Sequence, residues 1–169
     1  MTLPAWITPE FFTRVETMVY DANDYIFGAA GFGRKEEVEL IRLKAGVLLK
    51  EMLQNMEDAL NGATEPLYRI YSAHDTTVQA FLMTLEAKEA IIGKVLPDFA
   101  ATAVVELWKD QSNFAYVKLW YSDNAQTELR DVTSTIGGCG GGYTCTYQDF
   151  AARSAKFVEV DFDKACLKL

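Results

Sequence analysis

The feature that most constrains the fold is a change of hydrophobic period inside "LYRIYSAHDTTVQAFLMTLEA", residues 67–87. Residues 67–73 are aromatic and β-branched, a composition typical of a strand. From Val78 onward the apolar residues recur at spacings of three and four, as they do on one face of a helix. The pattern predicts a strand-to-helix junction whose centre is the pair His74–Asp75.

A junction of this kind is a place where ligands bind. In open α/β sheets ligands lie outside the carboxyl ends of strands, and the free N–H groups of a helix N-terminus attract anions. His74, the only histidine of the chain, and Asp75 are therefore predicted to lie at an anion site.

The residues alone leave two other interpretations of this pair. In the first, Asp75 caps the helix that follows it and His74 is a buried, hydrogen-bonded side chain. In the second, Ser72 is a nucleophile that uses His74 as its base, although the chain has no G-x-S-x-G elbow. A histidine–carboxylate metal site would need further ligands, and the chain has no second histidine.

Two helices are predicted before the junction. Thr8 can cap the first helix, with Pro9 and Glu10 in its first turn, and the glycine-containing residues 27–33 end it. The second helix is predicted over residues 34–60 from its apolar spacing. Because the connection between them is short, the two helices are expected to pack as an antiparallel pair.

Strands and one more helix are predicted after the junction. Residues 102–108 and 114–121 have strand composition, and the short "KDQSN" between them predicts a hairpin. Residues 146–157 predict a helix with Thr146 as N-cap and Asp149 as its capping-box partner. With 169 residues, the chain is expected to form one domain of the α/β class.

Charge and hydropathy exclude several classes of partner. The net charge is −8 and no basic cluster exceeds Arg34–Lys35, so nucleic acid is not an expected partner. No apolar run has the length of a membrane span. The first residues lack a basic region followed by an apolar one, so no signal peptide is expected in this chain.

The cysteines indicate an oxidising compartment. Cys139 and Cys145 lie in "GGCGGGYTC", where glycines allow the tight bend of a short disulfide loop. The alternative is two free thiols, and zinc is disfavoured because a structural site needs four ligands. A disulfide implies an oxidising environment and leaves Cys166 without a partner in the chain.

Several segments together resemble a known family. The segments are, in chain order, "LPAW", "RLKAGVLLKEML", "YSAHDTTV" after an apolar strand, "VVELW", "VKLWY" and "CTYQDFAARS". They are similar in content and order to the histidine acid phosphatases. These form branch 2 of the histidine phosphatase superfamily, and the prostatic and lysosomal types resemble this chain most. The resemblance spans nearly all of the chain but only about the C-terminal half of such an enzyme.

The resemblance implies a fold and a reaction. The chain is expected to be the C-terminal portion of a three-layer α/β fold, with residues 1–62 as a helical cap segment and 63–169 as part of the α/β core. The family hydrolyses phosphate monoesters through a phosphohistidine and needs no metal or cofactor. His74 then corresponds to a phosphate-binding residue and Asp75 to the general acid that protonates the leaving oxygen.

The sequence departs from the family at the nucleophile. It contains no Arg-His-Gly motif, and its single histidine is already assigned to the His-Asp pair. The chain is therefore expected to be inactive alone, as a truncated phosphatase. The alternative is a non-catalytic, phosphatase-derived binding protein.

The family also implies pairing, location and assembly. Cys139 and Cys145 match a local disulfide, whereas Cys166 matches a cysteine whose partner lies in the missing half. By resemblance the protein is secreted or lysosomal, and a homodimer is the implied assembly.

Overall fold

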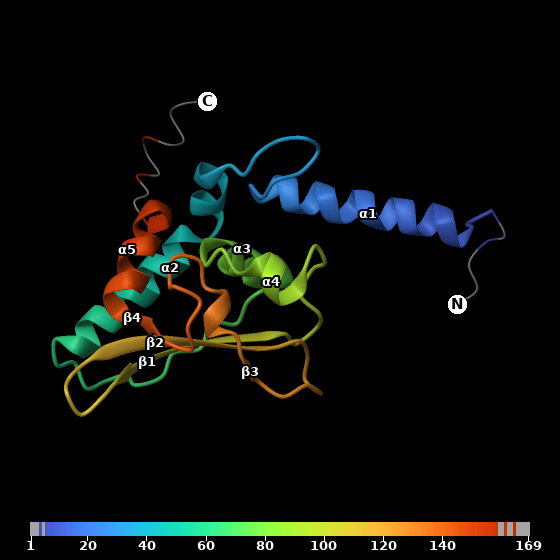
Figure 1. Ribbon diagram of the computed structural model, residues 1–169. Helices are drawn as coiled ribbons and strands as arrows, with labels where there is room; N and C mark the ends of the chain where they lie inside the picture. Colours follow the sequence, from blue (N-terminus) through green and yellow to red (C-terminus); the bar gives the residue numbers. More distant parts are fainter. Residues whose placement is uncertain (1–3, 5, 159–160, 162–163, 165–169) are drawn as a thin grey trace.

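Helices cover one face of a small antiparallel sheet (Figure 1), in a computed structural model that describes residues 4, 6–158, 161 and 164. The elements in chain order are α1 (Pro9–Ile26), α2 (Val38–Leu60), α3 (Asp75–Thr84), α4 (Lys88–Ile92), β1 (Thr102–Lys109), β2 (Ala115–Ser122), β3 (Arg130–Asp131), the 3-10 turn η1 (Thr133–Thr135), β4 (Cys145–Thr146) and α5 (Tyr147–Val158). The predicted α/β class is confirmed.

The sheet is built around the hairpin of β1 and β2. The two strands are antiparallel, with Val105 opposite Leu119, and β3 and β4 pair with the other edge of β2. The carboxylate of Asp110 accepts the N–H groups of Ser112 and Phe114 at 2.8 and 2.9 Å, which closes the connection. The predicted hairpin is confirmed.

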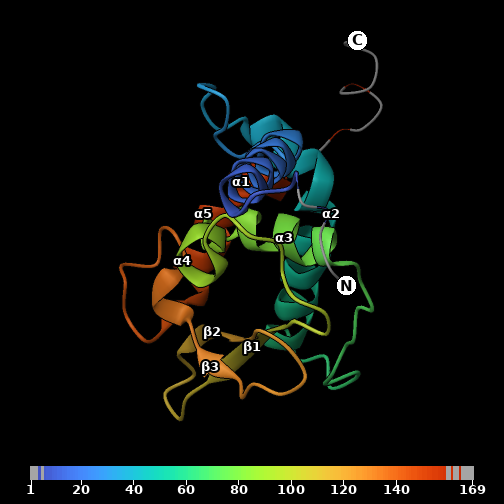
Figure 2. The same cartoon turned by 90° about the vertical axis from the view of Figure 1, so that its right-hand side faces the viewer.

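The core lies between β2 and the helices above it. Alternate β2 residues, Val117, Leu119 and Tyr121, are fully buried, and they belong to one cluster with residues of α2, α3 and α5. Figure 2 shows the sheet below and the helices above. This one-sided covering follows from the period of two along a strand, which sends every second side chain to the helices.

A glycine allows α2 and α5 to pack closely. A Cβ atom added at Gly46 would lie 2.1 Å from the backbone oxygen of Phe157. Both residues are buried, so no larger side chain fits between the helices at this point.

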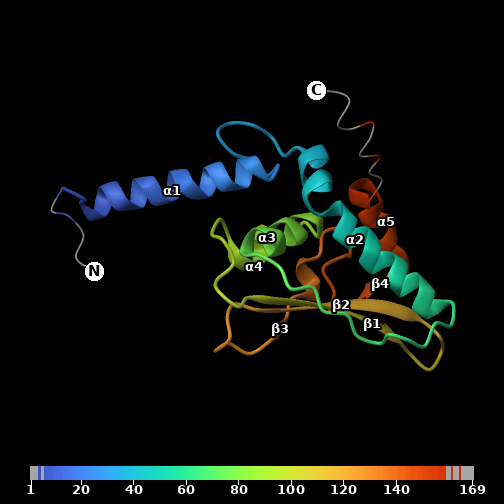
Figure 3. The ribbon, with the colours of Figure 1, turned by 180° about the vertical axis from the view of Figure 1, so that it is seen from behind.

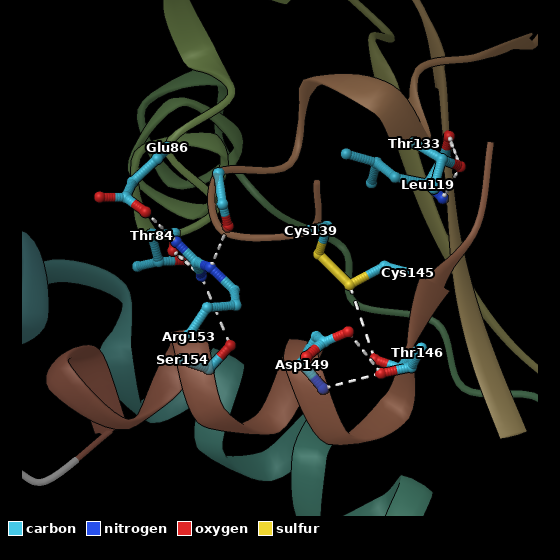
Figure 4. Close-up of a disulfide and its surroundings, with 11 residues drawn as sticks. Thr84, Glu86, Leu119, Thr133, Cys139, Cys145, Thr146, Asp149, Arg153 and Ser154 are labelled. Atoms are coloured by element: carbon cyan, nitrogen blue, oxygen red, sulfur yellow. Dashed lines mark hydrogen bonds and ion pairs between the residues drawn. A yellow bond between two sulfur atoms is a disulfide. The ribbon is translucent and has the colours of Figure 1, made fainter. Parts of the chain in front are cut away.

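The predicted start of α5 and the predicted disulfide are both confirmed. The Thr146 hydroxyl accepts the N–H of Asp149 at 3.0 Å and donates to its carboxylate at 2.8 Å. Cys139 and Cys145 form a disulfide with 5.0 Å between their Cα atoms, next to this cap (Figure 4). Cys166 lies outside the described residues.

The first helix has the predicted cap but not the predicted packing. The Thr8 hydroxyl accepts the N–H of Phe11 at 3.1 Å. However, α1 extends away from the body of the molecule (Figures 1 and 2), so the prediction of an antiparallel pair is wrong. Its apolar residues stay exposed: Phe11, Val15, Met18 and Ile26.

Polar contacts at the C-terminal end of α1 explain this orientation. Asp24 is buried and pairs with Lys88 at 2.8 Å, and it also accepts a hydrogen bond from Gln79. These contacts hold the end of α1 against α3 and α4 instead of along α2. The second helix also begins later than predicted, at Val38, because Glu37 is its N-cap.

Residues 67–73 do not form the predicted strand. Figure 3 shows the connection from α2 to α3 as irregular chain, and Leu67 and Ile70 are 89% and 75% exposed. A strand needs a neighbour that supplies N–H and C=O groups, and among the described residues none pairs with this segment. The strand prediction is therefore wrong for this chain, although the composition is that of a strand.

Candidate functional site

His74 and Asp75 lie where the sequence predicts, at the start of α3. His74 is the N-cap residue with an extended backbone (φ −82°, ψ 160°), and its carbonyl accepts the N–H groups of Thr77 and Val78, both at 3.0 Å. The helix therefore begins immediately after the histidine. Its N-terminal dipole and N–H groups are directed to the region in front of this pair.

The side chains of the pair are both exposed. One oxygen of Asp75 accepts the N–H of Thr76 at 2.7 Å, so the carboxylate does interact with the helix start. The interpretation of His74 as a buried, hydrogen-bonded side chain is wrong, since within the described part of the chain its imidazole has no such bond. Ser72 likewise shares no hydrogen bond with His74 there, so no serine triad is formed.

A cavity of about 350 Å³ brings the pair together with a second segment. One side contains residues 73–75 and Val78, and the other contains residues 97–101, which connect α4 to β1. Within that connection Ala100 has a φ of 63° and the Phe99 side chain is 98% exposed. This loop carries no periodic pattern or motif from which its place at the site could be predicted.

A second pocket of about 270 Å³ borders the first. Its lining is Ile91, Ile92, Val95, Leu96, Asp98, Tyr121 and Asp123. Asp98 lines both cavities, so the two are neighbours. The sequence predicts Tyr121 only as part of a strand, because burial of a strand residue beneath a distant loop is a tertiary property.

Tyr121 in this second pocket has a raised pKa. Burial raises the pKa of its hydroxyl to about 12, and the charge of Asp123 adds to the effect. Asp98 also raises this pKa, while Arg130, whose guanidinium lies 5.2 Å from the ring centre, lowers it. The hydroxyl is therefore uncharged near neutral pH.

Over the described ranges, no three His, Cys, Asp or Glu side chains are grouped so that they could hold a metal ion. None of the helices in those ranges combines the length and apolar character needed to cross a bilayer.

The sequence of the chain matches a known protein family. The sequence profile described as histidine phosphatase superfamily (branch 2) matches residues 5–122, which is more than half of the chain. The chain belongs to this superfamily. The matched region contains His74, Asp75 and both walls of the cavity, whereas the disulfide loop and α5 lie beyond it.

Individual acid phosphatases match almost the whole chain at low identity. Rat prostatic acid phosphatase is 28% identical over 166 residues, covering 98% of this chain and 40% of the relative. Lysosomal acid phosphatases of Xenopus laevis and Homo sapiens are 29% and 28% identical, covering 98% of this chain and 35% and 36% of the relatives. The chain thus spans about two fifths of the length of the relatives that it matches.

Proposed function

We propose that this chain supplies the His-Asp part of an acid phosphatase site that hydrolyses phosphate monoesters. His74 binds the phosphate and Asp75 is the general acid. The observation that carries the proposal is that both exposed side chains line one cavity at the N-terminus of α3, in a member of the histidine phosphatase superfamily.

The surroundings of the pair suit a phosphate. The N-terminus of α3 contributes a positive dipole and backbone N–H groups, which favour a bound anion. One Asp75 oxygen is held by the N–H of Thr76, which leaves the other oxygen to carry a proton toward the leaving group. A positioned proton donor of this kind accelerates such a step about 10²–10⁴-fold.

The nucleophile comes from polypeptide outside these 169 residues. A histidine nitrogen forms a bond to phosphorus, the P–O ester bond breaks, and the leaving oxygen takes the proton of Asp75. The single histidine of this chain cannot bind phosphate and be the nucleophile at once, and no Arg-His-Gly motif is present. The chain alone is therefore inactive toward phosphate monoesters.

The exposed apolar surface supports the proposal that this chain is only part of a larger domain. We assign residues 1–62 to a helical cap segment and 63–169 to the C-terminal part of an α/β core. β1 is an edge strand of the described sheet, and the strand-like residues 67–73 have no strand partner there, with Leu67 and Ile70 exposed. Such an edge is a template for another strand. Further polypeptide of the same fold would pair here and cover the apolar face of α1.

The experiment that tests the proposal isolates the natural protein with antibodies to this segment. Its intact mass, disulfide map and hydrolysis of an aryl phosphate at pH 5 are measured, followed by the same assay on Asp75→Asn. We expect a product about two and a half times as long as this chain, as its relatives are, whose activity falls at least a hundredfold in the variant. Aryl phosphate hydrolysis by the 169-residue chain alone would contradict the missing nucleophile.

The second candidate is a non-catalytic, phosphatase-derived binding protein. It is favoured by the absence of the Arg-His-Gly motif from a chain that still has a closed core. A natural product of only 169 residues, monomeric and inert toward aryl phosphates, would support this candidate against the first.

Location and assembly follow from the same proposal. The disulfide suits an oxidising compartment, and the relatives are named prostatic and lysosomal acid phosphatases, so we infer a secreted or lysosomal protein. A homodimer is the assembly to test by light scattering on the natural product.

A further inference from the structure

The second pocket, next to the cavity that His74 and Asp75 line, has no role in the proposed phosphate hydrolysis. Four aliphatic side chains from α4 and the residues after it form one wall: Ile91, Ile92, Val95 and Leu96. Tyr121 from β2 and two carboxylates complete the lining. The volume of about 270 Å³ suits a ligand of only a few carbon atoms.

The Tyr121 hydroxyl has no hydrogen-bond partner among the described residues, and a ligand could supply one. The residue is fully buried, and its hydroxyl oxygen makes no hydrogen bond with any residue that the structure describes. Buried polar groups in folded proteins are nearly always hydrogen-bonded, so an orphan hydroxyl beside a pocket indicates an absent bonding group. The hydroxyl can accept a hydrogen bond as well as donate one.

The charges around the pocket favour a cation. Asp123 is paired with Arg130 through both of its carboxylate oxygens, so its charge is largely compensated. Asp98 forms no ion pair among the described residues, and it contributes the uncompensated negative charge. Both carboxylates raise the pKa of the Tyr121 hydroxyl, as negative charges near this pocket do.

We propose that this pocket binds the primary ammonium group of a short aliphatic ligand. The ammonium lies between the Asp98 carboxylate and the Tyr121 hydroxyl, to which it donates hydrogen bonds, and the carbon chain contacts the aliphatic wall. Because Asp98 lines both cavities, a ligand can have its phosphate at His74 and its ammonium here. This inference rests on the proposed function, and it makes phosphate monoesters of amino alcohols the favoured substrates.

The test titrates the full chain with butylammonium, with butanol and butyrate as probes of the same length but different charge. We expect butylammonium to bind at least tenfold more tightly than either, with NMR shifts centred on Tyr121. Tyr121→Phe should weaken binding about threefold to tenfold, the usual range for one hydrogen bond, without lowering the melting temperature. Asp98→Asn should weaken it by a similar factor.

Matched control variants separate the pocket from general effects. Tyr116→Phe removes a hydroxyl from the same strand outside the pocket, and Asp58→Asn removes an exposed charge from α2. Neither should change butylammonium affinity. Equal binding of butylammonium and butanol, or affinities unchanged by Tyr121→Phe and Asp98→Asn, would overturn the proposal.

A separate titration with inorganic phosphate, followed at His74, distinguishes the two proposals. Butylammonium binding without phosphate binding would support the ammonium pocket and refute the proposed role of His74 as a phosphate-binding residue of this chain. Phosphate binding without butylammonium binding would refute the ammonium pocket and leave the proposed function standing.

Discussion

At the residue scale, Arg153 joins three parts of the chain that are distant in sequence. From α5 it donates to the carbonyl oxygens of Thr84 and Gly137 and to the carboxylate of Glu86 (Figure 4). Its side chain is only 4% exposed, so each of these acceptors offsets the cost of burying a charge. The end of α3, the disulfide loop and α5 are held together by this one guanidinium.

Because Arg153 pairs with the Glu86 carboxylate, part of the free energy of unfolding should depend on pH. Burial alone would raise its pKa, but hydrogen bonds from Lys156 and Arg153 outweigh burial and hold the pKa below its ordinary value. A carboxylate with a lowered folded-state pKa stabilises the fold above its unfolded-state pKa. That contribution is lost as the pH falls through the lower, folded-state value.

We therefore predict that Glu86→Gln lowers the free energy of unfolding by about 1 kcal/mol at pH 7, since the side chain is partly open to solvent. The difference from the unsubstituted chain should shrink below about pH 4, and urea titrations across pH measure it. Glu128→Gln, an exposed loop variant, is the control. A difference for Glu86→Gln that stays constant down to pH 2.5 would contradict this account.

At the element scale, two ion pairs between the end of α1 and the region of α4 have very different surroundings. The Asp24–Lys88 pair is buried, with side chains 9% and 6% exposed, whereas Lys94 in the Lys94–Asp21 pair is 61% exposed. Both have a closest distance of 2.8 Å. The closest distances are the same, but Lys88 also contacts the second Asp24 oxygen at 3.1 Å, so burial and this second contact together should separate their effects on stability.

We predict that Lys88→Met lowers the free energy of unfolding by about 3–5 kcal/mol, because Asp24 is left as an uncompensated buried charge. Lys94→Met should cause no measurable change, because water already screens the exposed pair. Thermal and urea denaturation of the two variants provide the comparison. Equal effects of the two substitutions would show that the Asp24–Lys88 pair is not buried in solution.

The contact of α2 with α5 supports a second prediction at this scale. Alanine normally stabilises a helix interior relative to glycine by about 1 kcal/mol. At Gly46 the added methyl group meets the Phe157 backbone oxygen, and overpacking of this kind costs about 1–3 kcal/mol. We expect Gly46→Ala to lower the melting temperature and Gly142→Ala, where the nearest atom is 3.6 Å away, to leave it unchanged. A raised melting temperature for Gly46→Ala would show that the helices separate easily.

At the scale of the whole molecule, the described chain has a buried core between β2 and the helices. It also has exposed apolar side chains outside this core. Leu67, Tyr68, Ile70 and the apolar face of α1 are exposed, and one edge of β1 has no strand partner among the described residues. Exposed apolar surface beside an open sheet edge favours association with other polypeptide.

We predict that the isolated chain self-associates, and that Leu67→Ser with Ile70→Ser reduces this association without lowering the melting temperature. Both side chains are almost fully exposed, so they contribute little to the core. Light scattering as a function of concentration measures the effect. Leu129→Ser, at a half-exposed leucine directly before β3, is the control that should change nothing. A strictly monomeric unsubstituted chain would contradict this prediction.

The features that the sequence determined by itself are local. Thr8 and Thr146 as caps, the 102–121 hairpin, the start of α3 after His74 and the short disulfide loop depend on near neighbours along the chain, so their patterns predict them. The family also follows from the sequence, because its segments occur in order.

Only the tertiary structure decided the features that need a distant partner. Residues 67–73 have strand composition, but a strand exists only where another strand supplies its hydrogen bonds. The direction of α1 depends on a buried pair between Asp24 and Lys88, 64 positions apart. The second pocket forms because α4 and its loop lie beside Tyr121. Local propensity carries no information on such long-range contacts, since they are formed by packing.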